Sequence, residues 1–250
     1  QAYHFKVLFL VLKKLGYAWA DGLYHLSYGM VDLPSGKMKS REGTVVDADD
    51  LIAEVIADAG KATGELGKLD EFTAGEKTGL FRMIGLAALK YFLLKVDPKK
   101  RMLFDPAASI DLQGHTGPFI QYTYARIKSL LRKAGLSVAG SQLSGEEATG
   151  TSGQLATNSY RLLQEERNVI KLLHQFPAVL NEAAMKLDPS SLANPTYELV
   201  KTYNGFYQSV PVLKEEDPAK RGFRLSLSAA VGDSVKKVMW CLGIEVPERM

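Results

Sequence analysis

Apolar residues recur every three or four positions along most of this 250-residue chain, and that spacing predicts a mainly helical fold. The clearest stripe follows Pro118 and consists of Ile120, Tyr124, Ile127 and Leu131. Pro118 fits the first turn of this helix, because the N–H that proline lacks is not needed there. The same spacing predicts further helices over residues 5–15, 48–59, 78–94, 160–174, 177–186, 195–213 and 219–242. The second half should therefore form an all-helical bundle.

Three shorter features interrupt this helical pattern. Residues 24–31 have β character and partial alternation, which predicts a strand. Asp47 is placed as the N-cap of the helix over 48–59, and Gly60 is placed as its stop. Residues 136–157 are rich in Gly, Ser and Thr, which predicts a long flexible loop.

A basic loop bounded by glycines, residues 36–43, follows the predicted strand. Its three cations are Lys37, Lys39 and Arg41. Such a loop can clamp a triphosphate, because cations stabilise the charge that moves onto a leaving pyrophosphate. A solvated basic hairpin tip accounts for the same residues. The glycine–lysine spacing of a Walker A loop at a helix start is absent.

Composition excludes several classes of protein. The single cysteine, Cys241, excludes an intramolecular disulfide and a multi-cysteine metal site, so we expect no metal site and a reducing compartment. No apolar run approaches the roughly 20 residues that span a bilayer, so no membrane segment is expected. The net charge of +3 says little about partners. The chain begins directly in a helical pattern at Gln1, so we expect it to be the C-terminal part of a longer protein.

Three regions together resemble a known family. The loop sequence GKMKSR at 36–41 resembles a degenerate form of the KMSKS loop of class I aminoacyl-tRNA synthetases. QAYHF at 1–5 and HLSYGMV at 25–31, then GHTGPFIQYTYARI at 114–127, then LGIEVPERM at 242–250 are similar to arginyl-tRNA synthetases, in the family's order. The resemblance covers nearly the whole chain apart from residues 136–157.

The resemblance implies a fold with two parts. Residues 1–60 would be the remnant of a Rossmann-type catalytic domain, with a strand, the KMSKS-like loop and helices. Residues 61–113 would be a connecting helical region, and residues 114–250 an all-helical anticodon-binding bundle. The HIGH-type signature of the family's first half is missing, because the sequence contains no His-x-Gly-His.

The resemblance also implies an arginine–tRNA ligase. Arginine would attack the α-phosphate of ATP to give arginyl-adenylate and pyrophosphate, and the arginyl group would then pass to tRNA(Arg). ATP would act as a substrate with Mg²⁺, without a prosthetic group, in a cytoplasmic monomer. This fragment alone is expected to be inactive, since half of the nucleotide site is missing.

The implied catalytic residues are Lys37, Lys39 and Arg41 of the basic loop. Lys37 matches the first lysine of the family motif and would contact the ATP phosphates, together with Ser40. Lys39 stands where the first serine is usual, Ser40 where the second lysine is usual, and Arg41 where the last serine is usual. Arginine suits phosphate well, so either Lys39 or Arg41 would do the work of the second lysine.

Two residues at the start of the chain match the family's substrate site. Gln1 matches a glutamine that helps to bind the substrate arginine, because an amide oxygen accepts a hydrogen bond from a guanidinium. His4 matches a histidine at the nucleotide side. Without the family, Gln1 is an ordinary first residue and His4 is a surface or core histidine.

Four residues match positions that contact the anticodon in the family: Tyr122, Arg126, Tyr207 and Met250. Splayed RNA bases stack on aromatic rings and on guanidinium planes, which suits three of them. Packing inside the bundle explains the tyrosines equally well. Tyr122 and Tyr124 lie on different faces of one helix, so at least one of them is expected in the core.

The alternative to a ligase is a stand-alone tRNA-binding helical module without catalysis. The basic loop at 36–43 speaks against this alternative, because a binding module has no need of it. A different class I synthetase, such as a cysteine or methionine enzyme, gains no support from the lone Cys241 and the absence of zinc-ligand clusters. A helical scaffold that resembles the family by accident would have to explain three segments in family order.

Overall fold

The computed structural model describes residues 1–34, 47–65, 69–136 and 161–250. Within these residues the chain forms eight α-helices, one 3-10 helix and two short strands, so the expected mainly helical fold is confirmed. The basic loop at 36–43 and residues 137–157 of the expected flexible loop lie outside the described residues.

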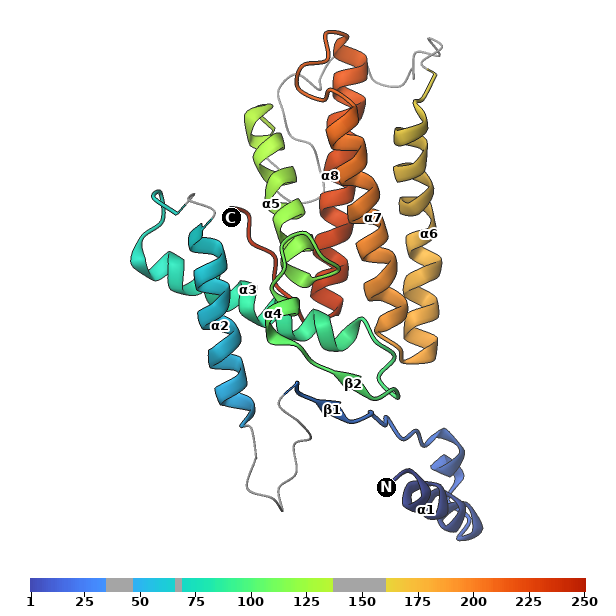
Figure 1. The fold of residues 1–250 in the computed structure, drawn as a ribbon. Helices are drawn as coiled ribbons and strands as arrows, with labels where there is room; N and C mark the ends of the chain where they lie inside the picture. The colour runs from blue at the N-terminus through green and yellow to red at the C-terminus, as the bar shows by residue number, and fades with distance from the viewer. Residues whose placement is uncertain (35–46, 66–68, 137–160) are drawn as a thin grey trace.

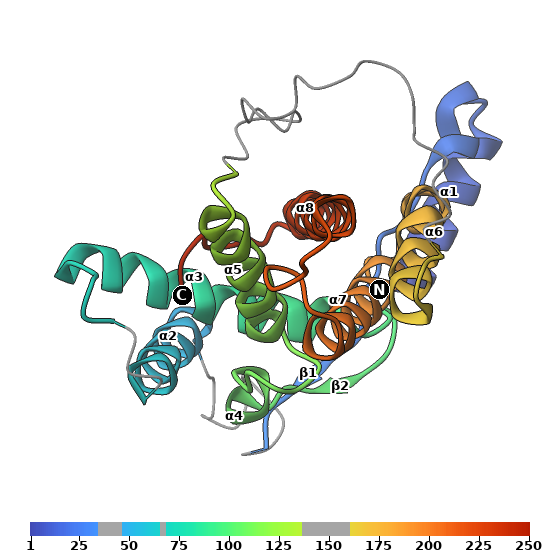
Figure 2. The same cartoon turned by 90° about the horizontal axis from the view of Figure 1, so that it is seen from above.

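The second half of the chain is a bundle of four helices that lie side by side (Figures 1 and 2). They are α5 (Gly117–Lys133), α6 (Gln164–Lys186), α7 (Ser190–Ser209) and α8 (Pro218–Cys241). Their inward faces share one hydrophobic core, which includes Tyr203, Phe206, Leu199 and Met239. Each such side chain contributes about 1.5–3 kcal/mol when it is fully removed from water. The stripe predicted on α5 faces this core, since all four of its residues are buried.

Helix α3 (Ala74–Leu94) crosses beneath the bundle and packs against α2 (Ala48–Glu65) on its other side (Figure 1). Two glycines, which have no side chain, let these helices approach closely. A β-carbon on Gly85 would lie 2.8 Å from the Cα of Ile56. At Gly60 a β-carbon would lie 3.1 Å from the Phe81 ring. The expectation that Gly60 ends the helix is therefore wrong, because this glycine makes room for Phe81 and the helix continues.

The junction between α5 and α3 makes a testable prediction about packing. A β-carbon on Gly117 would lie 2.8 Å from the carbonyl carbon of Ala87 and 3.0 Å from the Cβ of Tyr91. We expect Gly117→Ala to lower the free energy of unfolding by about 1–3 kcal/mol, because neither neighbour can move independently of α3. The control, Gly222→Ala on α8, meets nothing within 4 Å and should raise it by about 0.5–1 kcal/mol. Urea unfolding measures both, and an equal effect of the two changes would contradict this account.

The predicted strand is much shorter than expected. Only Val31–Asp32 forms a strand, β1, which pairs in parallel with β2 (Met102–Leu103). Phe104 N–H donates to the Asp32 carbonyl at 2.7 Å, and Met102 N–H donates to the Met30 carbonyl at 3.0 Å. Backbone outside this short contact has no neighbouring strand among the described residues, so most of residues 24–31 stays irregular. The short helix α4 (Pro106–Ser109) follows β2, with Asp105 as its N-cap.

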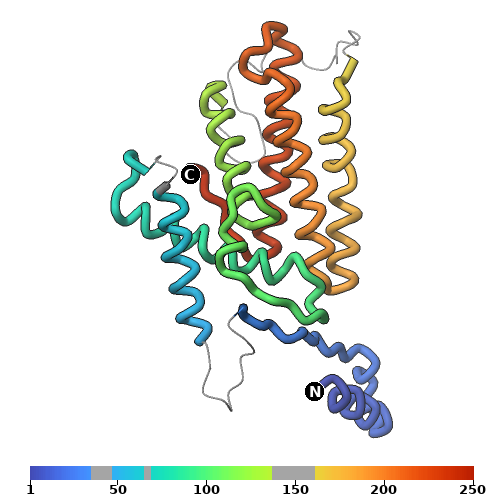
Figure 3. Tube along the Cα trace, in the orientation of Figure 1, coloured from blue at the N-terminus to red at the C-terminus, as the bar shows by residue number. Residues whose placement is uncertain are grey.

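The first helix, α1 (Ala2–Lys14), lies away from the bundle beside the 3-10 helix η1 (Ala18–Gly22), as the tube in Figure 3 shows. None of the α1 residues is buried. Its exposed apolar side chains include those of Tyr3, Leu8, Leu10 and Val11. This helix therefore adds nothing to the hydrophobic cores of the described residues.

Two of the differences from the predicted helices have a clear structural cause. Helix α3 begins at Ala74 and not at residue 78, because Thr73 and Glu76 form a capping box. Helix α6 runs through Pro177, where two helices were expected. Proline removes one helical hydrogen bond, but α6 packs along α7. Val169 and Ala183, on either side of Pro177, are buried in the core of the bundle, and this burial supports a continuous helix.

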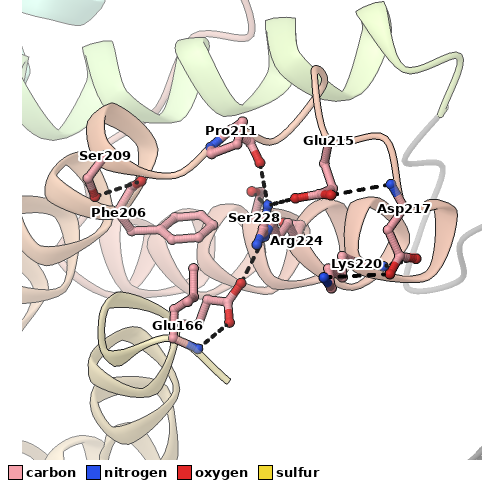
Figure 4. Close-up of polar contacts among 10 residues, drawn as sticks. Glu166, Phe206, Ser209, Pro211, Glu215, Asp217, Lys220, Arg224 and Ser228 are labelled. Atoms are coloured by element: carbon pink, nitrogen blue, oxygen red, sulfur yellow. Dashed lines mark hydrogen bonds and ion pairs between the residues drawn. The ribbon is translucent and has the colours of Figure 1, made fainter. Parts of the chain in front are cut away.

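A buried ion network joins three parts of the bundle (Figure 4). The Arg224 side chain on α8 is 4% exposed, and its Nε donates to Glu166 Oε1 of α6 at 2.8 Å. Its Nη1 donates to the Pro211 carbonyl at 2.7 Å and to the Glu215 carboxylate, both between α7 and α8. A hydrogen bond from the Asp217 backbone, followed by the Arg224 guanidinium, holds the pKa of Glu215 below its usual range. The network therefore ties the start of α6 to the α7–α8 connection.

Candidate functional site

A cleft of about 600 Å³ lies between α5, α7 and the loop that precedes α5. It is lined by Leu112, Gln113, Phe119, Tyr122, Arg126, Lys201, Asn204, Gly205 and Gln208. The α5 residues are spaced by three and four positions, and so are the α7 residues, which places each set on one face of its helix. The volume is within the usual range of ligand pockets. We call this space the α5–α7 cleft.

Arg126 contacts two residues that line the cleft, Asn204 and Tyr122, and also Tyr207 of α7. Its Nη1 donates to Asn204 Oδ1 at 3.1 Å. The guanidinium carbon lies 4.9 Å from the centre of the Tyr122 ring and 5.5 Å from the centre of the Tyr207 ring. Both distances are those of cation–π contacts. The structure thus brings together three of the four residues expected to contact tRNA.

The tyrosines near the cleft divide between core and surface. Tyr124 on α5 and Tyr203 on α7 are almost excluded from solvent, and burial raises the pKa of Tyr124 to about 12. Tyr122 and Tyr207 are only partly buried. The expectation that Tyr122 and Tyr124 lie on different faces, with at least one in the core, is confirmed by the burial of Tyr124. Tyr122 and Tyr207 retain ring surface that a ligand can contact.

An aromatic group extends the cleft toward the start of α7. His115 stacks on Tyr197 with 3.9 Å between ring centres, and Phe119 lies 5.6 Å from Tyr197. The Nζ of Lys201 lies 6.0 Å from the centre of the Tyr197 ring. Burial, and next the charge of Lys95, lowers the pKa of His115, so its ring is neutral at pH 7. The positive charge on this side of the cleft therefore comes from Lys201 and Arg126.

Sequence reasoning missed the α7 side of the cleft. Lys201, Asn204 and Gln208 follow each other at intervals of three and four residues, which puts polar groups on one face of a helix that is otherwise well buried. That spacing is the signal by which they could have been found. Buried apolar residues such as Leu199 and Val200 lie between these polar residues in the sequence, so the polar spacing is difficult to recognise.

Met250 lies in a different cleft. This second cleft has a volume of about 370 Å³ and is lined by residues 70–72 before α3, by Ala125, Ser129 and Arg132 of α5, and by Arg249 and Met250. The Met250 side chain packs against the cluster formed by Ala59, Leu80 and Ile84. The structure therefore separates Met250 from the α5–α7 cleft.

Side chains of α3 and α5 hold residues 243–250 in place. Lys90 Nζ donates to the Gly243 carbonyl at 2.6 Å, and Gln121 Nε2 donates to the Glu245 carbonyl at 2.7 Å. Arg132 Nη1 donates to the Glu248 carbonyl at 3.1 Å, and Lys128 forms an ion pair with the Glu248 carboxylate at the same distance. These contacts fix the path that brings Met250 to the second cleft.

The residues expected at the catalytic side are not all described. Lys37, Lys39, Ser40 and Arg41 lie outside the described residues, so their arrangement stays a prediction. Gln1 and His4 are exposed at the start of α1.

The strand before the basic loop is anchored. Asp32 of β1 is buried and forms an ion pair with Arg101, which precedes β2. After the loop, Asp47 Oδ1 accepts a hydrogen bond from the Asp49 N–H at 3.0 Å, as expected of an N-cap. Defined structure thus lies on both sides of the basic loop.

The described residues offer neither a metal-binding cluster nor a membrane-spanning helix. No group of three or more His, Cys, Asp or Glu side chains there is arranged to hold a metal ion. None of the described helices combines the length and the apolar character needed to cross a membrane.

Comparison with protein families gives two matches that divide the chain. Residues 1–105 match the family "tRNA synthetases class I (R), catalytic domain". Residues 120–250 match the "DALR anticodon binding domain". Six of the nine residues that line the α5–α7 cleft lie within the second match, and β1 with the basic loop lies within the first.

Individual relatives agree with these matches. The chain is 53% identical to an arginine–tRNA ligase of Flavobacterium psychrophilum, over 100% of this chain and 39% of that protein. It is 51% identical to an arginine–tRNA ligase of Parabacteroides distasonis, over 100% of this chain and 40% of that protein. The chain thus spans about two fifths of the length of these relatives.

Solved structures share the fold. The Thermus thermophilus arginyl-tRNA synthetase superposes with a TM-score of 0.77 at 28% identity, over 96% of this chain and 38% of that one. The Plasmodium falciparum arginyl-tRNA synthetase superposes with a TM-score of 0.74 at 23% identity, over 100% of this chain and 40% of that one. The expected combination of a class I catalytic remnant with a helical anticodon-binding domain is confirmed.

Proposed function

We propose that this chain, which belongs to the arginyl-tRNA synthetase family, supplies the phosphate-binding loop and the anticodon-binding bundle of an arginine–tRNA ligase. One observation carries the proposal: a class I catalytic match over residues 1–105 and an anticodon-binding match over residues 120–250 occur in one chain. The substrates would be arginine, ATP and tRNA(Arg). The stand-alone tRNA-binding module is not favoured, because the first match would have no purpose in it.

The basic loop would act in the first step. The arginine carboxylate attacks the α-phosphate of ATP, and negative charge accumulates on the departing pyrophosphate. Lys37, with Lys39 or Arg41, would hold these phosphates and stabilise that charge, which is the main way in which proteins accelerate such transfers. Ser40 would add a hydroxyl donor. Gln1 would bind the substrate guanidinium and His4 would lie at the nucleotide. Mg²⁺ would arrive as part of the ATP substrate.

The α5–α7 cleft would bind the anticodon region of tRNA(Arg). Unpaired RNA bases stack on exposed aromatic rings, and guanidinium groups bind both bases and phosphates. The rings of Tyr122 and Tyr207 both lie in cation–π contact with Arg126, which supports this assignment. Met250 would be a separate contact, since it lies in the second cleft. A cytoplasmic monomer is the proposed state of the enzyme.

Tyr207→Ala tests the assignment of the cleft. We expect the intact ligase with this change to bind tRNA(Arg) more weakly by about 1–3 kcal/mol, the usual contribution of one base–ring stack. The KM for arginine should stay unchanged, because the cleft does not contact the amino acid. Trp240→Ala on α8 is the control, since it removes an exposed ring that has no contact with Arg126, whereas the Tyr207 ring lies 5.5 Å from the Arg126 guanidinium carbon. If the Tyr207 variant charges tRNA(Arg) with the parent's KM, the ring is a packing residue.

A further inference from the structure

We propose that Asn204 is a positioning residue that holds the guanidinium of Arg126 in the orientation in which it contacts tRNA. This inference rests on the proposed function of the α5–α7 cleft and adds to it the group that prepares the cleft for RNA. Asn204 lies on α7 and is 9% exposed, whereas Arg126 lies on α5 and is only partly buried. A neutral side chain at the base of the cleft thus reaches across to a cation at its surface.

The direction of the hydrogen bonds fixes how the Asn204 amide is turned. Thr123 Oγ1 is fully buried and donates its only proton to the Phe119 carbonyl at 3.1 Å. The oxygen of Thr123 can then only accept, and Asn204 Nδ2 donates to it at 2.8 Å. The amide carbonyl is consequently turned toward Arg126, whose Nη1 donates to it at 3.1 Å. A flipped amide would set N–H groups against the N–H groups of the guanidinium.

This arrangement leaves most of the guanidinium available to a ligand. An arginine side chain has five N–H donors, and the structure assigns one of the Arg126 donors to Asn204. Within the described residues, its Nε and Nη2 make no hydrogen bond to protein, while the two tyrosine rings restrict where it can go. The Asn204 amide carries no charge, so it leaves the positive charge of Arg126 unchanged. An aspartate at the same position would partly neutralise that charge.

Anchoring of this kind strengthens binding by reducing its entropic cost. An arginine side chain loses rotamer freedom when it is fixed against a ligand, and a side chain that is already fixed loses less. The acceptors that would meet the remaining donors are the phosphate oxygens and base edges of single-stranded RNA. Asn204 would therefore affect tRNA affinity through Arg126, without touching the RNA itself.

A double-mutant cycle in the intact ligase tests this inference. The dissociation constant for tRNA(Arg) is measured at fixed salt for the parent, Asn204→Ala, Arg126→Ala and the double variant. We expect Arg126→Ala to weaken binding roughly 10- to 100-fold, and Asn204→Ala to weaken it roughly three- to tenfold. In the Arg126→Ala background, Asn204→Ala should have no further effect, because the residue through which it acts is gone. A purely structural role would weaken binding equally in both backgrounds.

Controls separate this inference from the function on which it rests. Asn194→Ala changes another α7 asparagine, whose Nδ2 bonds the Lys95 carbonyl at 3.1 Å, and should leave tRNA affinity unchanged. Asn204→Ser keeps a hydroxyl for Thr123 without reaching Arg126, and replaces Asn204→Ala if that variant does not fold. If Arg126→Ala leaves affinity unchanged, the proposed function of the cleft is wrong. Two other outcomes overturn the positioning role alone, provided that Arg126→Ala weakens binding. In the first, Asn204→Ala has no effect on tRNA affinity. In the second, Asn204→Ala weakens binding whether or not Arg126 is present.

Discussion

Arg224→Met is expected to lower the free energy of unfolding by about 3–5 kcal/mol, because it leaves a buried carboxylate without its cation. The Glu166 side chain is 0% exposed and accepts from Arg224 Nε at 2.8 Å. The same change releases Glu215 and the Pro211 carbonyl, to which Arg224 also donates. Methionine fills much of the volume of arginine, so the loss reports the missing charge and hydrogen bonds more than a cavity. Urea unfolding followed by circular dichroism measures it.

A matched variant and a pH series complete this test. Arg221→Met changes an exposed arginine one turn earlier on α8 and should alter stability by less than about 0.5 kcal/mol. Because the pKa of Glu215 is lowered in the folded protein, its stabilisation is present above the unfolded value of about 4.3 and is lost as the pH falls through the folded value. The parent should therefore lose more stability than Arg224→Met on acidification. A difference between them that is constant from pH 7 to pH 3 would contradict the proposed pairing.

Lys37→Ala is expected to slow arginyl-adenylate formation in the intact ligase by about 10²–10³-fold, the usual loss when one group that stabilises a developing charge is removed. The affinity for tRNA(Arg) should change little, because the proposed role of this charge is to hold the ATP phosphates. Arginine-dependent exchange between ATP and pyrophosphate, with tRNA(Arg) present, measures the first property. Direct binding measures the second.

Lys61→Ala is the control for this prediction, since Lys61 is an exposed lysine of α2 that forms an ion pair with Asp58 at 2.7 Å. An unchanged activation rate in Lys37→Ala would remove Lys37 from the catalytic residues. Parallel Lys39→Ala and Arg41→Ala variants decide which cation replaces the second lysine of the family motif. The one with the greater loss of activation rate would hold the phosphates.

Features with a local cause were predictable from the sequence. The α5 stripe follows from helical periodicity, and its start follows from Pro118 in the first turn. Asp47 acts as an N-cap through its own side chain. The beginning of α3 was equally readable, because Thr73 and Glu76 have the spacing of a capping box, yet periodicity alone places the helix four residues too late.

Features that depend on a distant partner were not predictable. Gly60 looks like a stop until Phe81 is known to pack against it. Pro177 looks like a break until α6 is seen to be buried in the core of the bundle on both sides of it. At the candidate site, helical spacing predicts that Tyr122 and Arg126 are neighbours on one face of α5. That Asn204 lies beside them is known only from the packing of α5 on α7. The path of residues 243–250, which takes Met250 to another cleft, depends on side chains more than 100 positions earlier.

The ion pair beside the basic loop has a consequence for protein synthesis. Asp32 meets Arg101, a residue 69 positions further along the chain. A ribosome adds about 5–20 residues per second, so roughly 3–14 seconds separate the two residues during translation. In that interval α2 and α3 are made while β1 has neither its strand partner nor its cation. The parallel pair and its ion pair therefore cannot close until the sequences of α2 and α3 have been synthesised.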